Sequence, residues 1–265
     1  MIKIGFTKYH GTANDFIIIN EESTPSFNTN NNDLIKRMCD RRTGIGADGL
    51  MLILKTDREG IDFEMLYYNS DGNPSSMCGN GGRCITLAAV HRSLVFERTR
   101  FLFGNDVYYS SYDASNGWVS LKMQNVERID QSEGDYILDT GSPHYVQFCS
   151  TSDKNVRTEG SAIRYSPRFH DNGINVNFVE FKENALHVLT YERGVEDETY
   201  SCGTGVVASV ISYAEKENLK LGVHSVQVKT KGGELEVSFE KKENIYENVF
   251  LKGPAVRVYQ GLFIE

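Results

Sequence analysis

Two similar phrases constrain this chain more than any other feature: "SMCGNGGRC" at residues 76–84 and "SCGTGVVAS" at residues 201–209. Each places a Cys-Gly-x-Gly sequence directly before a run typical of a helix, "RCITLAAVHRSL" in the first case and "VVASVISYAEKE" in the second. One glycine-rich turn of this kind is more often a helix cap than a site. Two of them in one chain need a joint explanation.

The segments that precede the two phrases follow the same order. A strand-like run and then a turn lead to Cys78, and a similar run and turn lead to Cys202. Further upstream, "GTANDFIII" and "TGSPHYVQF" are each a polar turn that enters a strand. We therefore predict an internal duplication, with the two halves joined near residues 122–134.

This pattern predicts an α+β fold with two pseudo-symmetric domains. Residues 1–128, with a final strand at 255–265, form the half that carries the Cys78 loop, and residues 129–254 form the half that carries the Cys202 loop. The segment "VHSVQVKTKGGELEVSFE" reads as a hairpin that turns at Gly232-Gly233. If the halves are related by a two-fold axis, the two cysteine loops meet at one cleft.

Composition excludes several classes of function. The net charge of -8 argues against nucleic-acid binding through general electrostatics. No run approaches the ~20 apolar residues that a membrane span needs, and the first residues lack a signal-peptide pattern, so we expect a cytoplasmic protein. The five cysteines are expected to be reduced, and without a Cys-x-x-Cys pair we expect no metal site.

The two thiols suggest a chemistry when they are taken together. A cysteine at the start of a helix can have its pKa lowered to roughly 3.5–7.5, so that a thiolate forms at neutral pH. A thiolate on one side of a carbon could remove a proton while a thiol on the other side delivers one. That sequence inverts a stereocentre without a cofactor, and the helix N-termini could bind an adjacent carboxylate.

Other candidates are weaker when each is taken alone. Cys39, Cys84 and Cys149 fit core positions. The segment "GIGADG" at residues 44–49 resembles a phosphate-binding loop but leads into a strand, so we interpret it as a turn. Glu192-Arg193 reads as a solvated pair or as a grip on a substrate carboxylate.

Taken together, the phrases resemble the diaminopimelate epimerase family. The matching stretches run from residue 8 to residue 205 in the family's order: "KYHGTANDFIIIN", "RRTGIGADGLM", "YYNSDGNPSSMCGNGGRC", "GSPHYV", "INVNFVE" and "ERGVEDETYSCGTG". The resemblance implies that each domain is a strand-rich, barrel-like layer around a central helix. It also implies cofactor-free interconversion of LL- and meso-diaminopimelate, which serves lysine and peptidoglycan synthesis, and a homodimer.

The resemblance also assigns roles to residues. Cys78 and Cys202 correspond to the acid/base thiols. His144 and Glu192 are similar to family residues that tune these thiols, His144 for Cys78 and Glu192 for Cys202. The substrate-binding positions that it implies are Asn14, Asn69, Gly79, Asn80, Asn175, Glu192, Arg193, Gly203 and Thr204. One departure is Ser142, where the family commonly has Asn, and it bears on fine specificity.

Four alternatives stay open. A second two-cysteine racemase, of the proline or hydroxyproline type, resembles the same fold but typically has His after the first Cys-Gly, where this chain has Asn80. An isomerase of the phenazine-biosynthesis type lacks the paired thiols. A thiol-redox protein would need a disulfide in its cycle, and an anion-binding module would leave both cysteines unexplained.

Overall fold

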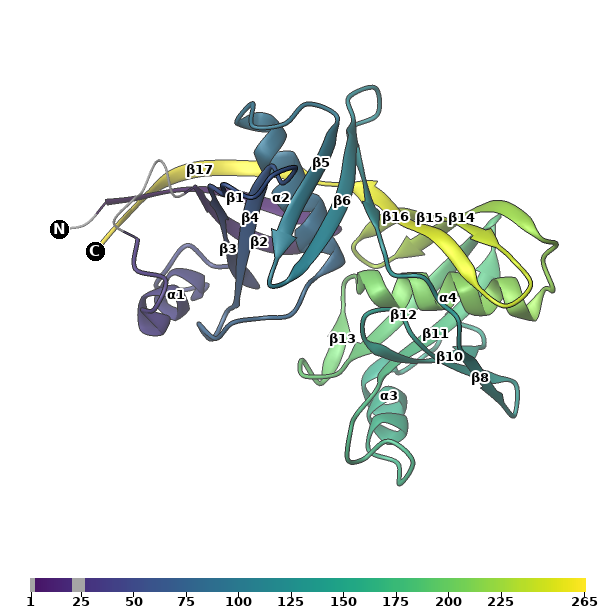
Figure 1. The fold of residues 1–265 in the computed structure, drawn as a ribbon. Helices are drawn as coiled ribbons and strands as arrows, with labels where there is room; N and C mark the ends of the chain where they lie inside the picture. The colour runs from purple at the N-terminus through teal and green to yellow at the C-terminus, as the bar shows by residue number, and fades with distance from the viewer. Residues whose placement is uncertain (1–2, 21–26) are drawn as a thin grey trace. The chain divides into compact units, whose positions relative to one another are not determined.

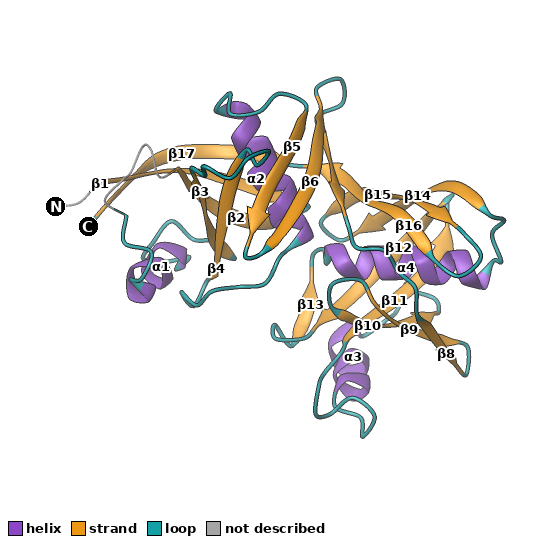
Figure 2. Ribbon diagram, in the orientation of Figure 1, coloured by secondary structure: helices purple, strands orange, loops and turns teal. Residues whose placement is uncertain are grey.

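The protein is described by a computed structural model that covers residues 3–20 and 27–265. The chain forms two compact units (Figures 1 and 2). The first unit is Met1–Leu121 with Pro254–Glu265, and the second is Lys122–Gly253. Both combine many strands with few helices, which confirms the predicted α+β class.

The first unit contains two helices among its described residues, together with the strands that surround them. In chain order its elements are β1 (Lys3–Gly11), β2 (Asn14–Asn20), α1 (Asn32–Cys39), β3 (Gly49–Leu54), β4 (Phe63–Asn69), α2 (Gly79–His91), β5 (Arg98–Phe103), β6 (Asp106–Asp113), β7 (Trp118–Lys122) and β17 (Val256–Ile264).

The second unit repeats this arrangement and adds one short strand. Its elements are β8 (Ile129–Ser132), β9 (Asp135–Asp139), β10 (Pro143–Phe148), α3 (Val156–Arg164), β11 (Asn175–Lys182), β12 (Ala185–Glu192), β13 (Asp197–Thr199), α4 (Gly203–Lys216), β14 (Gly222–Thr230), β15 (Gly233–Lys241) and β16 (Tyr246–Pro254).

Strand pairing follows the same order in both units. In the first unit, two pairs are parallel: β2 with β3, and β4 with β5. The other pairs are antiparallel: β17 with β1, β1 with β2, β3 with β4, β5 with β6, and β6 with β7. In the second, the parallel pairs are β10 with β11 and β12 with β14. Each parallel pair is joined by a crossover that contains a helix, as parallel pairing requires. The two units therefore share one topology, as an internal duplication predicts.

One helix in each unit is almost completely buried. In α2 the residues from Gly79 to Ala89 are buried. In α4 the buried residues are Gly203, 205–212 and Ala214. Strands of the same unit pack against α2 (β1, β2, β3, β6 and β17) and against α4 (β9, β10, β11, β12 and β15). A helix that is apolar on all sides belongs in a core, and these two are the central helices that the resemblance implies.

The other two helices are amphipathic and have side-chain caps. The Asn31 side chain accepts a hydrogen bond from the Leu34 N–H at 3.0 Å, and the Asn155 side chain accepts one from the Thr158 N–H at 3.1 Å. Asparagine at this position satisfies a backbone donor that has no acceptor within the helix. The helix α1 that follows Asn31 has the sequence "NDLIKRMC" and buries Leu34, Ile35, Met38 and Cys39.

The predicted hairpin is present, but its turn lies one residue earlier than expected. Thr230 pairs with Gly233, so the two-residue loop is Lys231-Gly232 instead of Gly232-Gly233. Gly233 is the first residue of the returning strand and has a φ of +140°. Gly233, which the sequence assigns to the turn, is therefore the first residue of the strand. Glycine suits this position because other residues rarely adopt this backbone conformation.

Gly160 allows α3 to pack closely against β12. A Cβ added at Gly160 would lie 2.4 Å from Cβ of Tyr191 and 2.7 Å from its Cγ, atoms that cannot move without the backbone. We expect Gly160→Ala to lower the free energy of unfolding by about 1–3 kcal/mol, which outweighs the gain of up to about 1 kcal/mol in helix propensity. Chemical denaturation measures the change.

The matched control is Thr158→Ala, an exposed position on the same helix. It should stay within about 0.5 kcal/mol of the natural chain. If Gly160→Ala is as stable as this control, the close contact between α3 and Tyr191 is not required.

Candidate active site

Both cysteines of the two phrases are helix N-caps. Cys78 precedes α2 with φ -116° and ψ 127°, and Cys202 precedes α4 with φ -111° and ψ 110°. The carbonyl of each cysteine accepts the first hydrogen bond of its helix, from Gly82 N–H at 2.8 Å and from Val206 N–H at 2.9 Å. The extended cap places each thiol beside the positive end of the helix.

The glycines after each cysteine allow a strand to approach the first helical turn. A Cβ added at Gly81 would lie 2.2 Å from Cε of Met51 on β3. A Cβ added at Gly205 would lie 2.4 Å from Oδ1 of Asn177 on β11. Both glycine positions are therefore closely packed, whether or not a ligand binds there.

The first turn of each helix can also act as an anion site. The N–H groups of residues 79–81 and 203–205 have no acceptor within their own helix, because an α-helix leaves its first donors unused. Together with the helix dipole they favour a carboxylate or phosphate. Gly79, Asn80, Gly203 and Thr204 belong to these two first turns.

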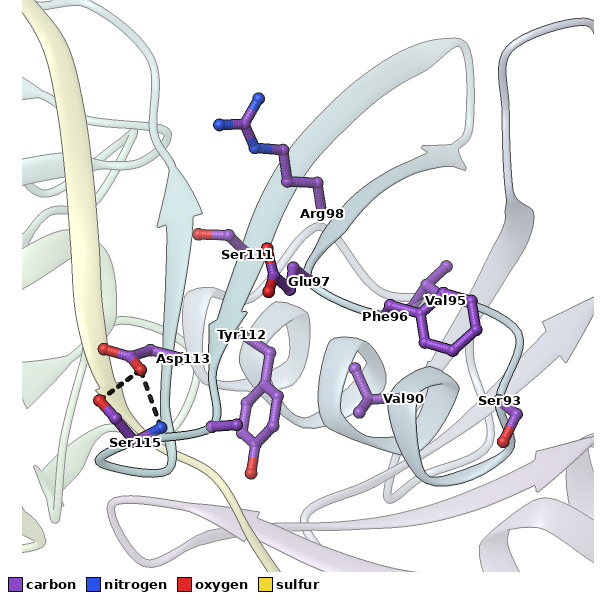
Figure 3. Close-up of a pocket in the computed structure, with 11 residues that line it drawn as sticks. Val90, Ser93, Val95, Phe96, Glu97, Arg98, Ser111, Tyr112, Asp113 and Ser115 are labelled. Carbon is purple, nitrogen blue, oxygen red and sulfur yellow. Dashed lines mark hydrogen bonds between the residues drawn. The ribbon is translucent and has the colours of Figure 1, made fainter.

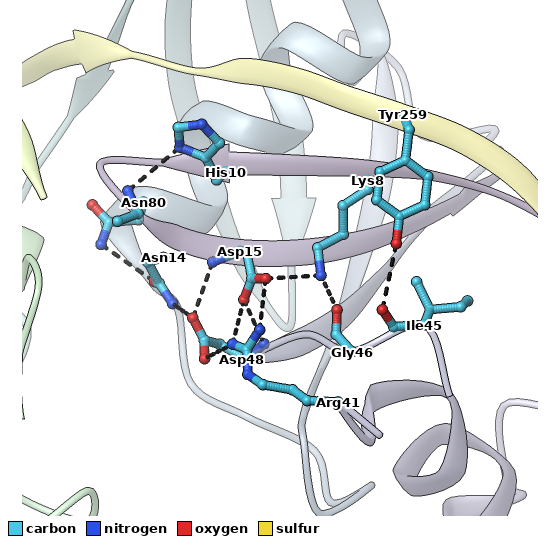
Figure 4. A network of polar contacts seen from close by, with 11 residues as sticks. Lys8, His10, Asn14, Asp15, Arg41, Ile45, Gly46, Asp48, Asn80 and Tyr259 are labelled. Atoms are coloured by element: carbon cyan, nitrogen blue, oxygen red, sulfur yellow. Dashed lines mark hydrogen bonds and ion pairs between the residues drawn. The ribbon is translucent and has the colours of Figure 1, made fainter. Parts of the chain in front are cut away.

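In the first unit, amide side chains surround Cys78. Asn14 Oδ1 lies 3.5 Å from Cys78 Sγ and accepts a hydrogen bond from Asn80 Nδ2 at 3.3 Å. Asn14 Nδ2 donates to a carboxylate oxygen of Asp48 at 2.8 Å, which fixes the orientation of the amide (Figure 4). The structure therefore brings together three of the predicted residues: Asn14, Cys78 and Asn80.

Behind these amides lies an ion-pair network that the sequence analysis missed. Arg41 donates to both carboxylate oxygens of Asp15, at 3.0 and 2.7 Å, and to Asp48 at 2.7 Å (Figure 4). Lys8 lies 2.8 Å from Asp15 and also donates to the carbonyl of Gly46. Burial alone would raise the pKa of Asp15, but the hydrogen bonds from Arg41 and Lys8 hold it well below its usual range. The network fixes the carboxylate that orients Asn14.

Arg83 is a further residue that the sequence analysis missed. Its side chain is fully buried and donates to Asn80 Oδ1 at 2.9 Å, to Thr12 Oγ1 at 3.2 Å and to the Gly79 carbonyl at 3.4 Å. Burial lowers its pKa to about 10, while the charge of a Cys84 or Cys78 thiolate would raise it. The sequence feature that could have indicated this role is the position of Arg83, a charged residue at the start of a predicted helix that is otherwise largely apolar.

In the second unit, Cys202 lies beside a hydroxyl and a histidine. Thr204 Oγ1 is 3.5 Å from Cys202 Sγ and 2.9 Å from His144 Nε2. His144 is fully buried, and desolvation together with the positive charge of Arg193 lowers its pKa to about 3. The imidazole is therefore neutral at physiological pH. Within this unit His144 contacts the Cys202 loop.

A second polar group in this unit is built on Asn175, which is adjacent to His144 in the β10–β11 register. Asn175 Nδ2 donates to Ser142 Oγ at 2.8 Å and to the Pro143 carbonyl at 3.0 Å. Its Oδ1 accepts from the Arg193 backbone N–H at 2.9 Å. The hydroxyl of Ser142, the residue that departs from the family pattern, thus belongs to the same group.

The remaining predicted residues lie at strand ends. Asn69 closes β4, is exposed and accepts a hydrogen bond from Ser75 Oγ at 2.8 Å. Glu192 closes β12, and the Arg193 guanidinium donates to the Asn172 carbonyl at 2.8 Å. These side chains are not drawn into the hydrogen bonds around Cys78 or Cys202 that are described above.

The other cysteines differ from the two N-caps. Cys39 is buried in the first core, where desolvation raises the pKa of its thiol to about 12. Burial also raises the pKa of Cys84 and, less completely, that of half-buried Cys149. All three remain thiols at neutral pH and cannot act as bases.

Two cavities open on the first unit. One of about 700 Å³ lies at the C-terminal end of α2, lined by residues such as Val90, Phe96 and Tyr112 (Figure 3). Because α2 rises about 1.5 Å per residue, this cavity is roughly 18 Å along the helix from Cys78. The other, of about 610 Å³, is lined by Lys8, Asp15 and their neighbours, and so adjoins the ion-pair network.

Two further observations bear on ligands and membranes. Across residues 3–20 and 27–265, no group of three or more His, Cys, Asp or Glu side chains is arranged to hold a metal ion. None of the helices in the described part of the chain has the length and apolar character of a membrane span.

The buried His144 should leave a signature in the pH dependence of stability. The unfolded chain binds a proton at His144 below its ordinary pKa of about 6.5, whereas the folded chain does so only near pH 3. The contribution of His144 to the free energy of unfolding is therefore fully present above pH 6.5. It is lost as the pH falls from 6.5 toward 3, by up to about 1.4 kcal/mol per pH unit.

Denaturant unfolding of the natural chain and of His144→Gln between pH 7 and pH 4 tests this expectation. The variant, which has no imidazole, should show a shallower loss of stability on acidification. His170→Gln is the control, because the side chain of His170 is 68% exposed. Equal slopes for the natural chain and His144→Gln would contradict the burial of a neutral imidazole.

The sequence matches one family of known proteins. A profile described as diaminopimelate epimerase covers residues 6–127 and 136–258. The chain is 45% identical over 255 residues to the diaminopimelate epimerase of Flavobacterium psychrophilum, covering 96% of this chain and 97% of that protein. It is 39% identical to the diaminopimelate epimerase of Chlorobaculum tepidum, with 95% and 98% covered.

Solved structures share the fold at low sequence identity. A phenazine biosynthesis protein of the PhzF family from Bacillus anthracis superposes with a TM-score of 0.80, at 13% identity and with 100% of both chains covered. A hydroxyproline epimerase from Agrobacterium vitis gives a TM-score of 0.69 at 11% identity, covering 98% of this chain and 92% of that one. These likenesses support the two-domain fold alone. The profile match and the relatives that align along nearly the whole sequence place this chain in the diaminopimelate epimerase family.

Proposed function

We propose that this chain is an isomerase that interconverts LL- and meso-2,6-diaminopimelate without pyridoxal phosphate or any other cofactor. The observation that carries the proposal is the placement of Cys78 and Cys202, each the N-cap of the central helix of its unit. Membership of the family supports the substrate. The product would serve lysine and peptidoglycan synthesis.

In the proposed reaction the thiols of Cys78 and Cys202 act on opposite faces of one α-carbon. One thiolate removes the α-proton and becomes a thiol, and the other thiol delivers its proton to the opposite face and becomes a thiolate. The carbon is inverted, no electron is gained or lost, and the enzyme ends with its protonation reversed. The reverse reaction uses the thiols in the opposite roles.

The helix N-termini would stabilise the charge that develops when the α-proton leaves. Electron density then moves into the α-carboxylate, and N–H donors that are already fixed in direction lower the barrier. The first-turn amides at Gly79, Asn80, Gly203 and Thr204 are donors of this kind. Removal of one such donor typically costs about 3 kcal/mol of transition-state stabilisation.

The distal end of diaminopimelate carries a second carboxylate and a second ammonium group. We assign Arg193 to the distal carboxylate and Glu192 to the distal ammonium, because opposite charges in hydrogen-bond range are the strong recognition pairs. Asn14, Asn69 and Asn175 would supply neutral donors and acceptors. The hydrogen bond that Asn175 donates to Ser142 supports a place for the shorter serine in this group.

Deuterium incorporation tests the proposed reaction. The reduced protein, without added pyridoxal phosphate, is incubated with LL-diaminopimelate in D2O, and the meso product is analysed by NMR and mass spectrometry. We expect meso product that carries deuterium at the inverted carbon, because the delivering thiol exchanges with solvent. Cys78→Ala and Cys202→Ala should each lower the rate by roughly 10²- to 10⁴-fold.

Cys149→Ala is the matched control and should keep the rate, since its thiol lies outside both loops. Turnover close to that of the natural chain in Cys78→Ala or Cys202→Ala would exclude the two-thiol mechanism. Exchange with proline or hydroxyproline but not with diaminopimelate would instead assign the chain to the other two-cysteine racemases.

We also propose that the protein is a homodimer that works in the cytoplasm, where thiols are kept reduced. Support for a dimer comes from β17, which pairs with β1 and exposes several large apolar side chains. Five of them are between 42% and 64% exposed: Val256, Val258, Tyr259, Leu262 and Ile264. An apolar strand of this length commonly marks a protein interface.

Sedimentation velocity at micromolar concentration tests the dimer. Val258→Lys places a charge in the middle of the apolar strand and should shift the chain toward monomer. Phe96→Lys is the matched control, because Phe96 is 81% exposed and lies outside β17. A natural chain that sediments as a monomer, or a Phe96→Lys variant that dissociates equally, would contradict an interface on β17.

A further inference from the structure

A chain of hydrogen bonds in the second unit leads from the core to the cysteine at the start of α4. Its members are Thr190 on β12, Asn177 on β11, His144 on β10, and Thr204 and Cys202 at the helix start. Asn177 and His144 have no exposed surface, and Thr190 is 3% exposed. Since water is excluded from these side chains, each hydrogen has to be accounted for by a protein partner.

The direction of the bonds is fixed at Asn177. Its amide donates two hydrogens, one to the Tyr145 carbonyl at 3.1 Å and one to His144 Nδ1 at 3.0 Å. Its Oδ1 accepts from the Thr190 hydroxyl at 2.9 Å. A flipped amide would place Oδ1 against the Tyr145 carbonyl, two acceptors without a hydrogen between them. The observed orientation is therefore the one that satisfies all of the groups.

This orientation determines the tautomer of His144. Because Nδ1 accepts a hydrogen bond, the neutral imidazole carries its hydrogen on Nε2. Nε2 lies 2.9 Å from Thr204 Oγ1, so His144 donates to the hydroxyl oxygen. Arg193, which follows β12, is the charged group that acts on His144, and together with burial it keeps the ring neutral.

The last step concerns the hydroxyl hydrogen of Thr204. With His144 as donor to its oxygen, the hydroxyl is left to donate its own hydrogen, and Cys202 Sγ lies 3.5 Å away. We propose that Asn177 is a positioning residue that fixes the tautomer of His144 and thereby makes Thr204 a hydrogen-bond donor to the Cys202 thiolate. No proton travels along the chain, because each group keeps its own hydrogen.

This inference rests on the proposed function for its purpose, since it gives the Cys202 thiolate a donor whichever direction the reaction takes. When Cys202 acts as the base, the donor stabilises the starting thiolate. When Cys202 acts as the acid, the donor stabilises the thiolate that forms. The contact at Cys78 has the opposite polarity, because the acceptor Asn14 Oδ1 lies 3.5 Å from its sulfur.

Two measurements that need no substrate test the proposal. The nitrogen NMR spectrum of ¹⁵N-histidine protein reports which ring nitrogen of His144 carries hydrogen, with His144→Gln for assignment. The pH dependence of alkylation by iodoacetamide reports the ionisation of Cys202 in a Cys78→Ala background. In that background we expect Thr204→Val and Asn177→Leu to raise the pH midpoint, the former by about one to two pH units.

Thr204→Ser keeps the hydroxyl, so the pH midpoint of Cys202 alkylation should be the same as with Thr204. Thr190→Val is the control for stability, because it removes a buried hydrogen bond while Asn177 can still donate to His144. It should unfold more easily with an unchanged midpoint. In a Cys202→Ala background, Thr204→Val should leave the alkylation of Cys78 unchanged.

Hydrogen on Nδ1 of His144 in the natural chain would overturn the proposal, as would an unchanged midpoint in Thr204→Val. If Asn177→Leu does not fold, two results still test the proposal. They are the ¹⁵N-histidine spectrum of the natural chain and the alkylation midpoints of Thr204→Val and Thr204→Ser. Failure of the deuterium experiment together with a shifted midpoint would remove the substrate assignment and leave the hydrogen-bond chain standing.

Discussion

The packing of strands around a helix with a nearly bare first turn is the interaction on which each unit depends. Gly81 and Gly205 let β3 and β11 come within contact of the helix backbone. The N-cap residues Cys78 and Cys202 make no side-chain capping hydrogen bond to these first turns. The fold therefore leaves strong donors beside a cysteine, and the chemistry follows from the same glycines that allow the core to close.

The surroundings of the two N-cap thiols differ even though the topology is shared. Cys78 has the amide oxygen of Asn14 beside it, held by Asp48 and the ion pairs behind it. Cys202 has the hydroxyl of Thr204, held by a neutral histidine. Duplication has preserved the backbone that places a thiol at a helix end, while the polar groups behind each thiol are built from different residue types.

Much of the fold could be predicted from local patterns. The presence of α2 and of α4 followed from glycine and apolar residues that are neighbours in the sequence. Both helices begin earlier than predicted, at Gly79 and Gly203, so the glycines form the first turn instead of a loop before it. The hairpin turn was wrong by one residue because Gly232 and Gly233 suit a turn equally well, and only the strand register separates them. The resemblance to a family supplied the candidate residues, whose roles remain predictions.

Arg83 and Asn177 were not found because their importance depends on burial and on partners far along the chain. An arginine in the sequence normally indicates a solvated position, and nothing adjacent to Arg83 shows that Thr12 and Asn80 enclose it. Likewise Asn177 reads as one polar residue in an alternating strand. Its hydrogen bond to His144 joins residues that are 33 positions apart in the sequence.

The pairing of β1 with β17 has a consequence for synthesis of the chain. Lys3 lies opposite Ile264, so the second unit is inserted between the two strands that complete the first. On a ribosome, the second unit has all of its strands once β16 has emerged, whereas β1 waits for β17. The unit that is translated first is thus the one that finishes folding last, and a nascent chain that stops short of its end leaves an open sheet edge at β1.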